Sequence, residues 1–194
     1  LDLGQGPHMK PLSEQTLERY RFEYVIGSVH AVRGIIDFAS VEYDKMSDDR
    51  LRGLLAQYIE ELYELIEWGR FSTLAHITYP YRYYRKHGRA YLLPQDTESE
   101  LAMFDGVLRA LIAAGKPLEV NTSGLRQGMG CPLPDYELLA HYYRLGGRKL
   151  TVGSDAHYLR DVGAGIPEVC ERLRGLGFET VCTFAGGRET PLPL

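Results

Sequence analysis

Five short apolar runs alternate with longer helical patterns along this chain, and this alternation limits the folds that are open to it. The runs are rich in β-branched residues and span residues 23–30, 71–77, 117–122, 149–154 and 180–184. Repeated strand–helix units are typical of α/β proteins, in which helices cover a mostly parallel sheet. The sequence therefore predicts mostly parallel strands that alternate with helices, in one domain over residues 1–194.

Helices are expected between these strands wherever apolar residues recur every three or four positions. The pattern and its flanking residues predict helices over residues 48–68, 101–115, 134–147 and 166–177. Ser47 is a suitable N-cap for the first of them. Thr97 and Glu100 form a capping-box pattern before the second, which Gly115 can end. The loops that follow strands are longer and richer in tyrosine and arginine than the loops that follow helices.

Composition excludes some classes of function. The formal net charge of -4 does not favour nucleic-acid binding. The sequence contains no apolar stretch of roughly 20 residues and opens on no signal peptide, so neither a membrane span nor secretion is expected. Its three cysteines lack metal-ligand spacing and are odd in number: Cys131, Cys170 and Cys182. A cytoplasmic protein without structural disulfides is the simplest interpretation.

Histidine and carboxylate side chains recur at the ends of successive predicted strands. The residues at these ends are His30, His76, Glu119, Asn121, Asp155 and His157. In parallel barrels the active site forms at the carboxyl ends of the strands. Side chains two apart in an extended chain point the same way, so Asp155 and His157 are expected to face the barrel mouth together. Neutral imidazoles and carboxylates suit zinc, manganese or iron, and the set predicts a metal or catalytic site.

Simpler interpretations exist for single members of this set. A lone histidine at a strand end is more often structural, and Asp155 is also a suitable helix N-cap. His8, His87 and His141 lack the strand-end placement, and no role is assigned to them.

Arginines in the loops after strands are candidates for binding an anion. Arg82, Arg126 and Arg160 each follow a strand end, and a guanidinium group donates two parallel hydrogen bonds to phosphate. Arg85 and Arg89 are expected to be solvated loop charges. The neighbouring tyrosines have two open interpretations, lining a pocket or packing the loop against the barrel rim: Tyr79, Tyr81, Tyr83 and Tyr84.

The segments YVIGSVH, LAHITYPYRYY, LEVNTSGLR and LTVGSDAH, in this order, resemble the histidinol-phosphatases of the PHP (polymerase and histidinol phosphatase) superfamily. The resemblance extends from about Phe22 to Phe184. It implies a distorted seven-stranded β/α barrel that binds up to three divalent metal ions and hydrolyses phosphate monoesters. This chain would be the C-terminal portion of the family's domain, an incomplete or distorted (β/α)7 PHP-type barrel.

The resemblance also implies roles for individual residues. It assigns metal binding to His30, His76, Asp155 and His157. Asp155 and His157 would also be catalytic, while Glu119 and Asn121 would lie near the site. The opening LDLGQ resembles a family strand that carries a bridging carboxylate, which makes Asp2 a fifth candidate ligand. If residues 1–10 are instead the remnant of a tag or linker, Asp2 has no role.

One departure from the family bears on activity and assembly. The family's first strand carries an His-x-His motif, which this chain lacks, so the first strands are expected to be missing. Missing strands would expose sheet edges, which a homodimer or a separate N-terminal chain would cover. The metal site would also lose several ligands.

The leading hypothesis is a metal-dependent phosphoesterase of histidine biosynthesis that hydrolyses a small phosphate monoester by metal-activated water. A first alternative is a catalytically impaired remnant that serves as a metal-, anion- or partner-binding module. A second is a metal-dependent hydrolase of carbon–nitrogen bonds on a similar barrel, which the arginine-rich loops disfavour. The sequence leaves the identity and number of the metal ions open.

Overall fold

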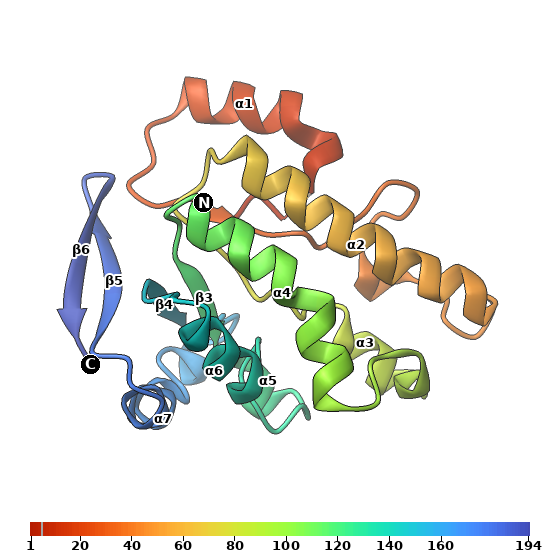
Figure 1. The fold of residues 1–194 in the computed structure, drawn as a ribbon. Helices are drawn as coiled ribbons and strands as arrows, with labels where there is room; N and C mark the ends of the chain where they lie inside the picture. The colour runs from red at the N-terminus through yellow and green to blue at the C-terminus, as the bar shows by residue number, and fades with distance from the viewer. Residues whose placement is uncertain (5) are drawn as a thin grey trace.

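The centre of the fold is a parallel four-stranded sheet (Figure 1). The computed structural model describes residues 1–4 and 6–194; Gln5, within the stretch considered as a tag remnant, lies outside the described residues. The strands are β1 (Ile26–Gly27), β2 (Thr73–Leu74), β3 (Leu118–Asn121) and β4 (Leu150–Gly153), in the order β1-β2-β3-β4. Each lies within a predicted run, which confirms the α/β class with parallel strands. Within the described residues the sheet stays open and does not close into a barrel.

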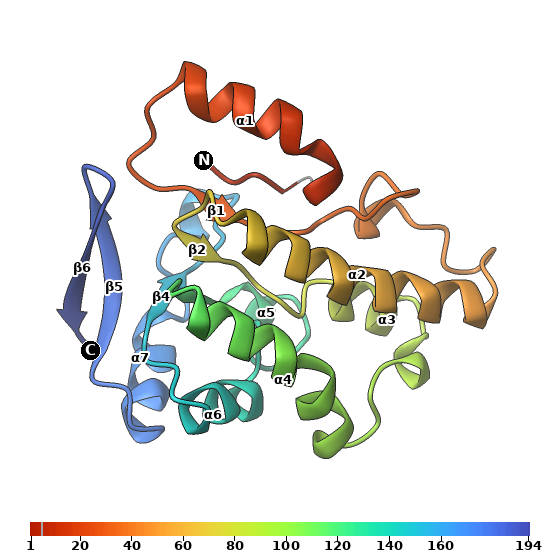
Figure 2. The same cartoon turned by 45° about the horizontal axis from the view of Figure 1, so that its top comes forward.

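The first four residues extend this sheet beyond β1. Asp2 forms a parallel bridge with Ile26, whose carbonyl oxygen accepts the Leu3 N–H at 3.0 Å. The His30 N–H donates to the Gly4 carbonyl oxygen at 2.8 Å. Figure 2 shows the chain start, marked N, below α1 (Lys10–Arg19) and near β1. This pairing makes residues 1–4 an additional strand segment at the edge of the sheet.

The expectation that the fifth apolar run joins the parallel sheet is wrong. β5 (Thr180–Ala185) pairs antiparallel with β6 (Arg188–Pro193) in a separate hairpin. Gly186 and Gly187 form the turn, with φ angles of 56° and 75° that glycine adopts without steric cost. The hairpin packs beside β4, and its Phe184 ring lies 5.0 Å from that of Tyr24, just before β1.

Seven α-helices are formed by the described residues. Besides α1 they are α2 (Asp48–Trp68), α3 (Tyr81–Lys86), α4 (Thr97–Ala113), α5 (Ser123–Arg126), α6 (Tyr136–Arg144) and α7 (Ile166–Gly175). Single 3₁₀ turns lie at Pro7–Met9, Phe38–Ser40, Ala90–Leu92 and Leu159–Asp161. The four predicted helices are confirmed, and the Ser47 hydroxyl caps α2 by accepting the Arg50 N–H. The capping box at Thr97 is wrong: Asp96 caps α4 instead, by accepting the Ser99 N–H at 2.8 Å.

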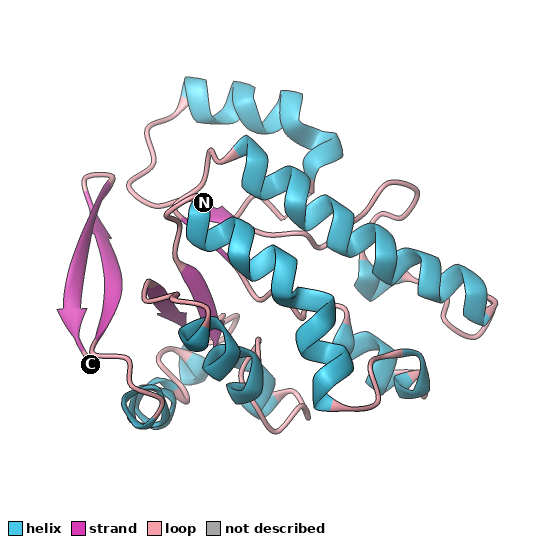
Figure 3. Cartoon of the chain, in the orientation of Figure 1, coloured by secondary structure: helices cyan, strands magenta, loops and turns pink. Residues whose placement is uncertain are grey.

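The hydrophobic core lies where α2 and α4 pack side by side over the sheet (Figure 3). Leu51, Leu54 and Leu62 line one face of α2 and are fully buried. Burial of each such leucine contributes about 1.5–3 kcal/mol, so this face anchors the helix over the strand ends. None of the helices within residues 1–4 and 6–194 combines the length and hydropathy that a transmembrane segment requires.

Glu100, in the first turn of α4, is expected to make the stability of the fold depend on pH. Burial, with a further contribution from nearby Asp135, raises the pKa of Glu100 from its ordinary 4.5 to about 7. Between pH 4.5 and 7 the Glu100 carboxyl is protonated in the folded state and ionised in the unfolded chain. The free energy of unfolding is therefore expected to fall as the pH rises through this range.

The Glu100→Gln variant is expected to exceed the wild-type protein in free energy of unfolding at pH 8 but not at pH 5. Urea denaturation at both pH values measures the difference. Glu98→Gln, an exposed change in the first turn of the same helix, is the control. If the free energy of unfolding depends on pH equally in the wild-type and Glu100→Gln proteins, protonation of Glu100 does not contribute to stability.

Candidate metal centre

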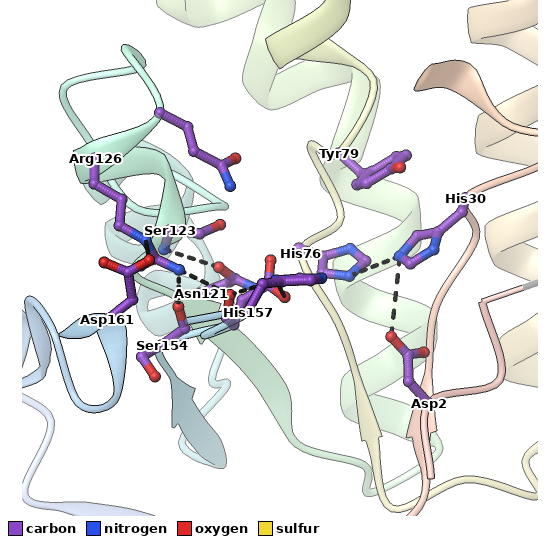
Figure 4. A network of polar contacts seen from close by, with 12 residues as sticks. Asp2, His30, His76, Tyr79, Asn121, Ser123, Arg126, Ser154, His157 and Asp161 are labelled. Atoms are coloured by element: carbon purple, nitrogen blue, oxygen red, sulfur yellow. Dashed lines mark hydrogen bonds and ion pairs between the residues drawn. The ribbon is translucent and has the colours of Figure 1, made fainter. Parts of the chain in front are cut away.

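Asp2, His30 and His76 converge at the carboxyl ends of neighbouring strand segments. One ligand atom from each lies within 4.8 Å of the other two. The His30 Nε2 atom is 3.2 Å from the Nε2 atom of His76 and 4.0 Å from Asp2 Oδ2 (Figure 4). The chain segments that carry the three side chains lie side by side in the sheet, which brings together residues far apart in sequence.

The geometry of this cluster fits a divalent metal ion. Two nitrogen ligands about 2.0–2.1 Å from a tetrahedral zinc ion lie roughly 3.3 Å apart. The two Nε2 atoms of His30 and His76 are 3.2 Å apart, close to that separation. Two imidazoles and one carboxylate are also a common donor set for zinc and for other first-row metals.

His76 is held in a form suited to metal binding. Its ring is buried, and burial, followed by the proximity of His30 and Arg82, holds its pKa well below the usual range. A neutral imidazole is the form that coordinates metal. The backbone of His76 has a φ of 30°, a left-handed conformation that costs on the order of 1–3 kcal/mol in a non-glycine residue. Such strain at a buried polar residue is typical of a functional position.

Asp2 is oriented by hydrogen bonds from two neighbours. Its Oδ1 atom accepts the Gly4 N–H at 3.1 Å and the Ser28 hydroxyl. Ser28 is fully buried and also accepts the Gly4 N–H, at 3.0 Å. The sequence analysis missed Ser28, although it lies two positions before His30 in the GSVH segment.

Asp155 and His157 line the same cavity as this cluster, but they are not among the three residues whose ligand atoms converge. Strand β4 ends at Gly153, and Asp155 has a φ of 50°, so the chain is not extended where the alternation argument required it. The His157 Nδ1 atom lies 3.0 Å from the Asp155 carbonyl oxygen and 3.7 Å from its Oδ1 atom. Both side chains line a cavity of about 540 Å³ together with Asp2 and His30.

Two arginines present unpartnered N–H groups at the same cavity. Arg82 donates to Gln127 Oε1 at 2.6 Å, while its Nε and Nη2 atoms are buried without a partner among the described residues. Arg126 Nη2 donates to the carbonyl oxygens of Ser154 and Asp155 at 2.6 and 2.7 Å, and its Nη1 atom is buried without a partner there. Charged donors without acceptors are costly when buried, so this arrangement favours an anion as their partner.

Arg160 differs from these two arginines. Its side chain is 79% exposed, lies over the Tyr158 ring and does not line the cavity. Its predicted contact with the substrate phosphate therefore has less structural support.

Glu119 and Asn121 lie on β3 inside the sheet, next to the cluster. They line a smaller cavity of about 170 Å³ together with Asp2, His76 and Asp155. Burial raises the pKa of Glu119 to about 8, against an opposing hydrogen bond from Asn121. Asn121 Oδ1 accepts the Ser123 N–H at 2.9 Å and fixes the turn after β3.

Asp37 and two tyrosines form a cavity wall that the sequence analysis did not assign. The Tyr79 hydroxyl donates to Asp37 Oδ1 at 3.0 Å and accepts from the Tyr83 hydroxyl at 2.9 Å. The Tyr79 ring stacks on His30 with centroids 4.4 Å apart. Tyr79 and Tyr83 line the pocket, which agrees with the first interpretation. Tyr81 and Tyr84 pack in the hydrophobic core, to which Tyr79 also belongs. Asp37 lies in the loop between β1 and α2, past the strand-end positions that the sequence analysis considered.

Comparison with curated proteins finds histidinol-phosphatases. The chain is 38% identical over 126 residues to the "Probable histidinol-phosphatase" of Thermotoga maritima, a match that covers 65% of this chain and 50% of that protein. It is 24% identical over 189 residues to the histidinol-phosphatase of Lactococcus lactis, covering 96% of this chain and 67% of that protein. The chain thus spans about half to two thirds of the length of these relatives. No family model matches it.

A solved structure supports the same fold. The crystal structure of the Lactococcus lactis histidinol phosphate phosphatase, a complex with zinc, L-histidinol and phosphate, superposes with a TM-score of 0.74 at 20% identity. The match covers 98% of this chain and 70% of that protein.

Proposed function

We propose that the chain belongs to the PHP-type histidinol-phosphatase family and is a metal-dependent phosphoesterase that hydrolyses a phosphate monoester. One observation carries the proposal. A cluster of metal-ligand type and two arginines with unpartnered donors face the same cavity of about 540 Å³. Metal-dependent hydrolysis of a small phosphate ester uses both features at once.

Asp2, His30 and His76 would hold a divalent ion such as zinc, manganese or iron. When bound, such an ion supplies a Lewis acid that polarises a phosphoryl oxygen and lowers the pKa of water. We propose that Asp155 and His157 contribute further ligands or proton transfer, and their lining of the same cavity supports this.

Arg82 and Arg126 would bind the substrate phosphate. Their unpartnered N–H groups can donate to two phosphoryl oxygens, and they would stabilise the charge that grows on these oxygens in the transition state. The hydrogen bonds from Arg126 to the carbonyl oxygens of Ser154 and Asp155 would orient that guanidinium and the loop with His157 together.

His157 is suited to moving a proton. If its Nδ1 atom donates to the Asp155 carbonyl oxygen, the Nε2 lone pair is left free, and the second nitrogen can accept or return a proton. The side chain is 76% exposed, so the proton can exchange with solvent.

The ester we propose as substrate is a phosphorylated amino alcohol such as histidinol phosphate. Support comes from the Lactococcus lactis neighbour, which was crystallised with zinc, L-histidinol and phosphate. The Asp37 carboxylate on the cavity wall offers a contact for a cationic leaving group.

We further propose that a second copy of the chain or a separate N-terminal chain covers the open sheet edges. Within the described residues, β4 pairs by hydrogen bonds with β3 alone, although the β5–β6 hairpin packs beside it, and residues 1–4 form the other edge. Light scattering on the purified chain distinguishes a monomer from a dimer. We also propose a cytoplasmic location, where the three free thiols would remain reduced.

Phosphate release from histidinol phosphate tests the proposed activity. We expect hydrolysis after loading with zinc or manganese, none after chelation, and competitive inhibition by inorganic phosphate. The His157→Ala variant serves as the low-activity reference. If the metal-loaded wild-type protein hydrolyses the ester no faster than the His157→Ala variant, the alternative of a metal- or anion-binding module is favoured.

A further inference from the structure

Glu61 is a fully buried carboxylate on α2, on the side of the helix that faces the candidate metal centre's supporting loops. Its Oε1 atom accepts the backbone N–H of Arg33 at 2.8 Å and the Gln57 amide at 3.0 Å. Its Oε2 atom lies 3.5 Å from His8 Nδ1. A buried carboxylate is costly without such donors, so its contacts restrict where the surrounding segments can lie.

The first of these segments is the loop that carries His30. Arg33 follows His30 by three residues, and its backbone N–H is fixed by Glu61. The Arg33 side chain has a different main partner: its guanidinium group binds Glu64 through two hydrogen bonds of 2.9 and 2.6 Å. Glu61 therefore holds the loop backbone and forms a longer ion pair of 3.4 Å with Arg33 Nη1, whereas Glu64 is the main partner of the half-exposed guanidinium group.

The second segment is the N-terminal strand that carries Asp2. Gly6 has a φ of 70°, and a Cβ atom there would lie 2.6 Å from the Ala31 carbonyl oxygen and 3.1 Å from Glu61 Oε2. The chain at Gly6 and His8 thus packs directly on Glu61 and on the residue after His30. On the other side of Gln5, the Gly4 carbonyl oxygen accepts the His30 N–H at 2.8 Å.

We propose that Glu61 is a positioning residue that sets the distance between Asp2 and His30 and so tunes the affinity of the metal centre. The inference rests on the proposed function, because it requires that these residues bind a metal ion. Glu61 touches neither the candidate ligands nor the substrate cavity; it acts through the Ala31–Arg33 loop and through Gly6 and His8. Residues that orient metal ligands change metal affinity by about 10–100-fold when replaced.

Cobalt(II) titration of the metal-stripped full chain tests the proposal, read through the visible absorption of the bound ion and its dissociation constant. We expect Glu61→Gln to weaken cobalt binding by about 10–100-fold and to alter the absorption spectrum. Glu64→Gln, one turn further along α2, should match the wild-type protein in both. A purely structural role for Glu61 would lower the thermal unfolding temperature and leave the spectrum of the bound ion unchanged.

A second variant acts from the opposite side of the same contact. Gly6→Ala should push the N-terminal segment away from Ala31 and Glu61, and we expect the same loss of cobalt affinity with the core intact. If the Glu61→Gln protein fails to fold, the Gly6→Ala variant still tests whether this contact sets the cobalt affinity. If the folded Glu61→Gln and Gly6→Ala variants bind cobalt with the affinity and spectrum of the wild-type protein, Glu61 does not position the ligands. This result would not contradict the metal centre itself. Absence of cobalt binding by the wild-type protein would overturn the metal centre and this inference together.

Discussion

Replacing His76 with alanine is expected to lower kcat/KM for phosphate-ester hydrolysis by more than about 100-fold. Residues that only orient metal ligands cost 10–100-fold in metal affinity or activity, and a direct ligand should cost more. His76 faces His30 at 3.2 Å and is buried as a neutral imidazole, so alanine would remove a central donor of the cluster. Steady-state kinetics at a fixed, saturating zinc concentration measures the loss.

The control for this change is His87→Ala. His87 stacks on the Tyr43 ring at 4.8 Å, away from the candidate centre, and its replacement removes an imidazole of the same size. We expect wild-type kcat/KM from this variant. Activity within threefold of wild type in a folded, zinc-saturated His76→Ala protein would mean that the cluster is not the site of catalysis.

The second large effect is expected from Arg82→Ala, as a higher KM together with a lower kcat. A hydrogen bond to a charged group contributes about 1.5–3 kcal/mol, which corresponds to a loss of about 10–150-fold in kcat/KM. Inorganic phosphate should inhibit the variant more weakly by a comparable factor, since the same donors would bind it. Arg82→Lys should recover only part of the loss, because an ammonium group lacks the planar fork of donors.

Arg85→Ala is the matched control, three residues further along the same helix. Arg85 is exposed and does not line the large cavity, so its loss should leave KM and phosphate inhibition unchanged. If Arg82→Ala keeps the wild-type KM and inhibition constant, the unpartnered donors of Arg82 do not bind the substrate phosphate.

The sequence was most informative where periodicity and strand ends coincide. Apolar residues spaced three and four positions apart predict a helix over residues 48–68, and α2 has these bounds, Asp48–Trp68. His30 and His76 were found because parallel strands bring their carboxyl ends to one edge, and the structure places their Nε2 atoms 3.2 Å apart. The resemblance to histidinol-phosphatases is confirmed by the curated relatives and by the solved structure.

Other parts depended on tertiary contacts that periodicity does not encode. The run over residues 180–184 is a strand, but the Gly186–Gly187 turn pairs it with its neighbour in the chain and not with β4. The left-handed conformation at Asp155 turns the chain where an extended strand was assumed, so alternation could not place His157. Glutamate usually lies on the solvent-exposed face of a helix, so the sequence does not mark Glu61 as buried. Residues 6–8 and 31–33 pack against this part of α2 and bury its carboxylate.

The metal content of the purified chain tests the central claim most directly. Elemental analysis after dialysis against zinc and then metal-free buffer should find at least one ion per wild-type chain. The folded His30→Ala/His76→Ala double variant should retain substantially less, because it keeps only one donor of the three-residue cluster. Equal zinc content in the two proteins, or none in either, would contradict a metal centre at Asp2, His30 and His76.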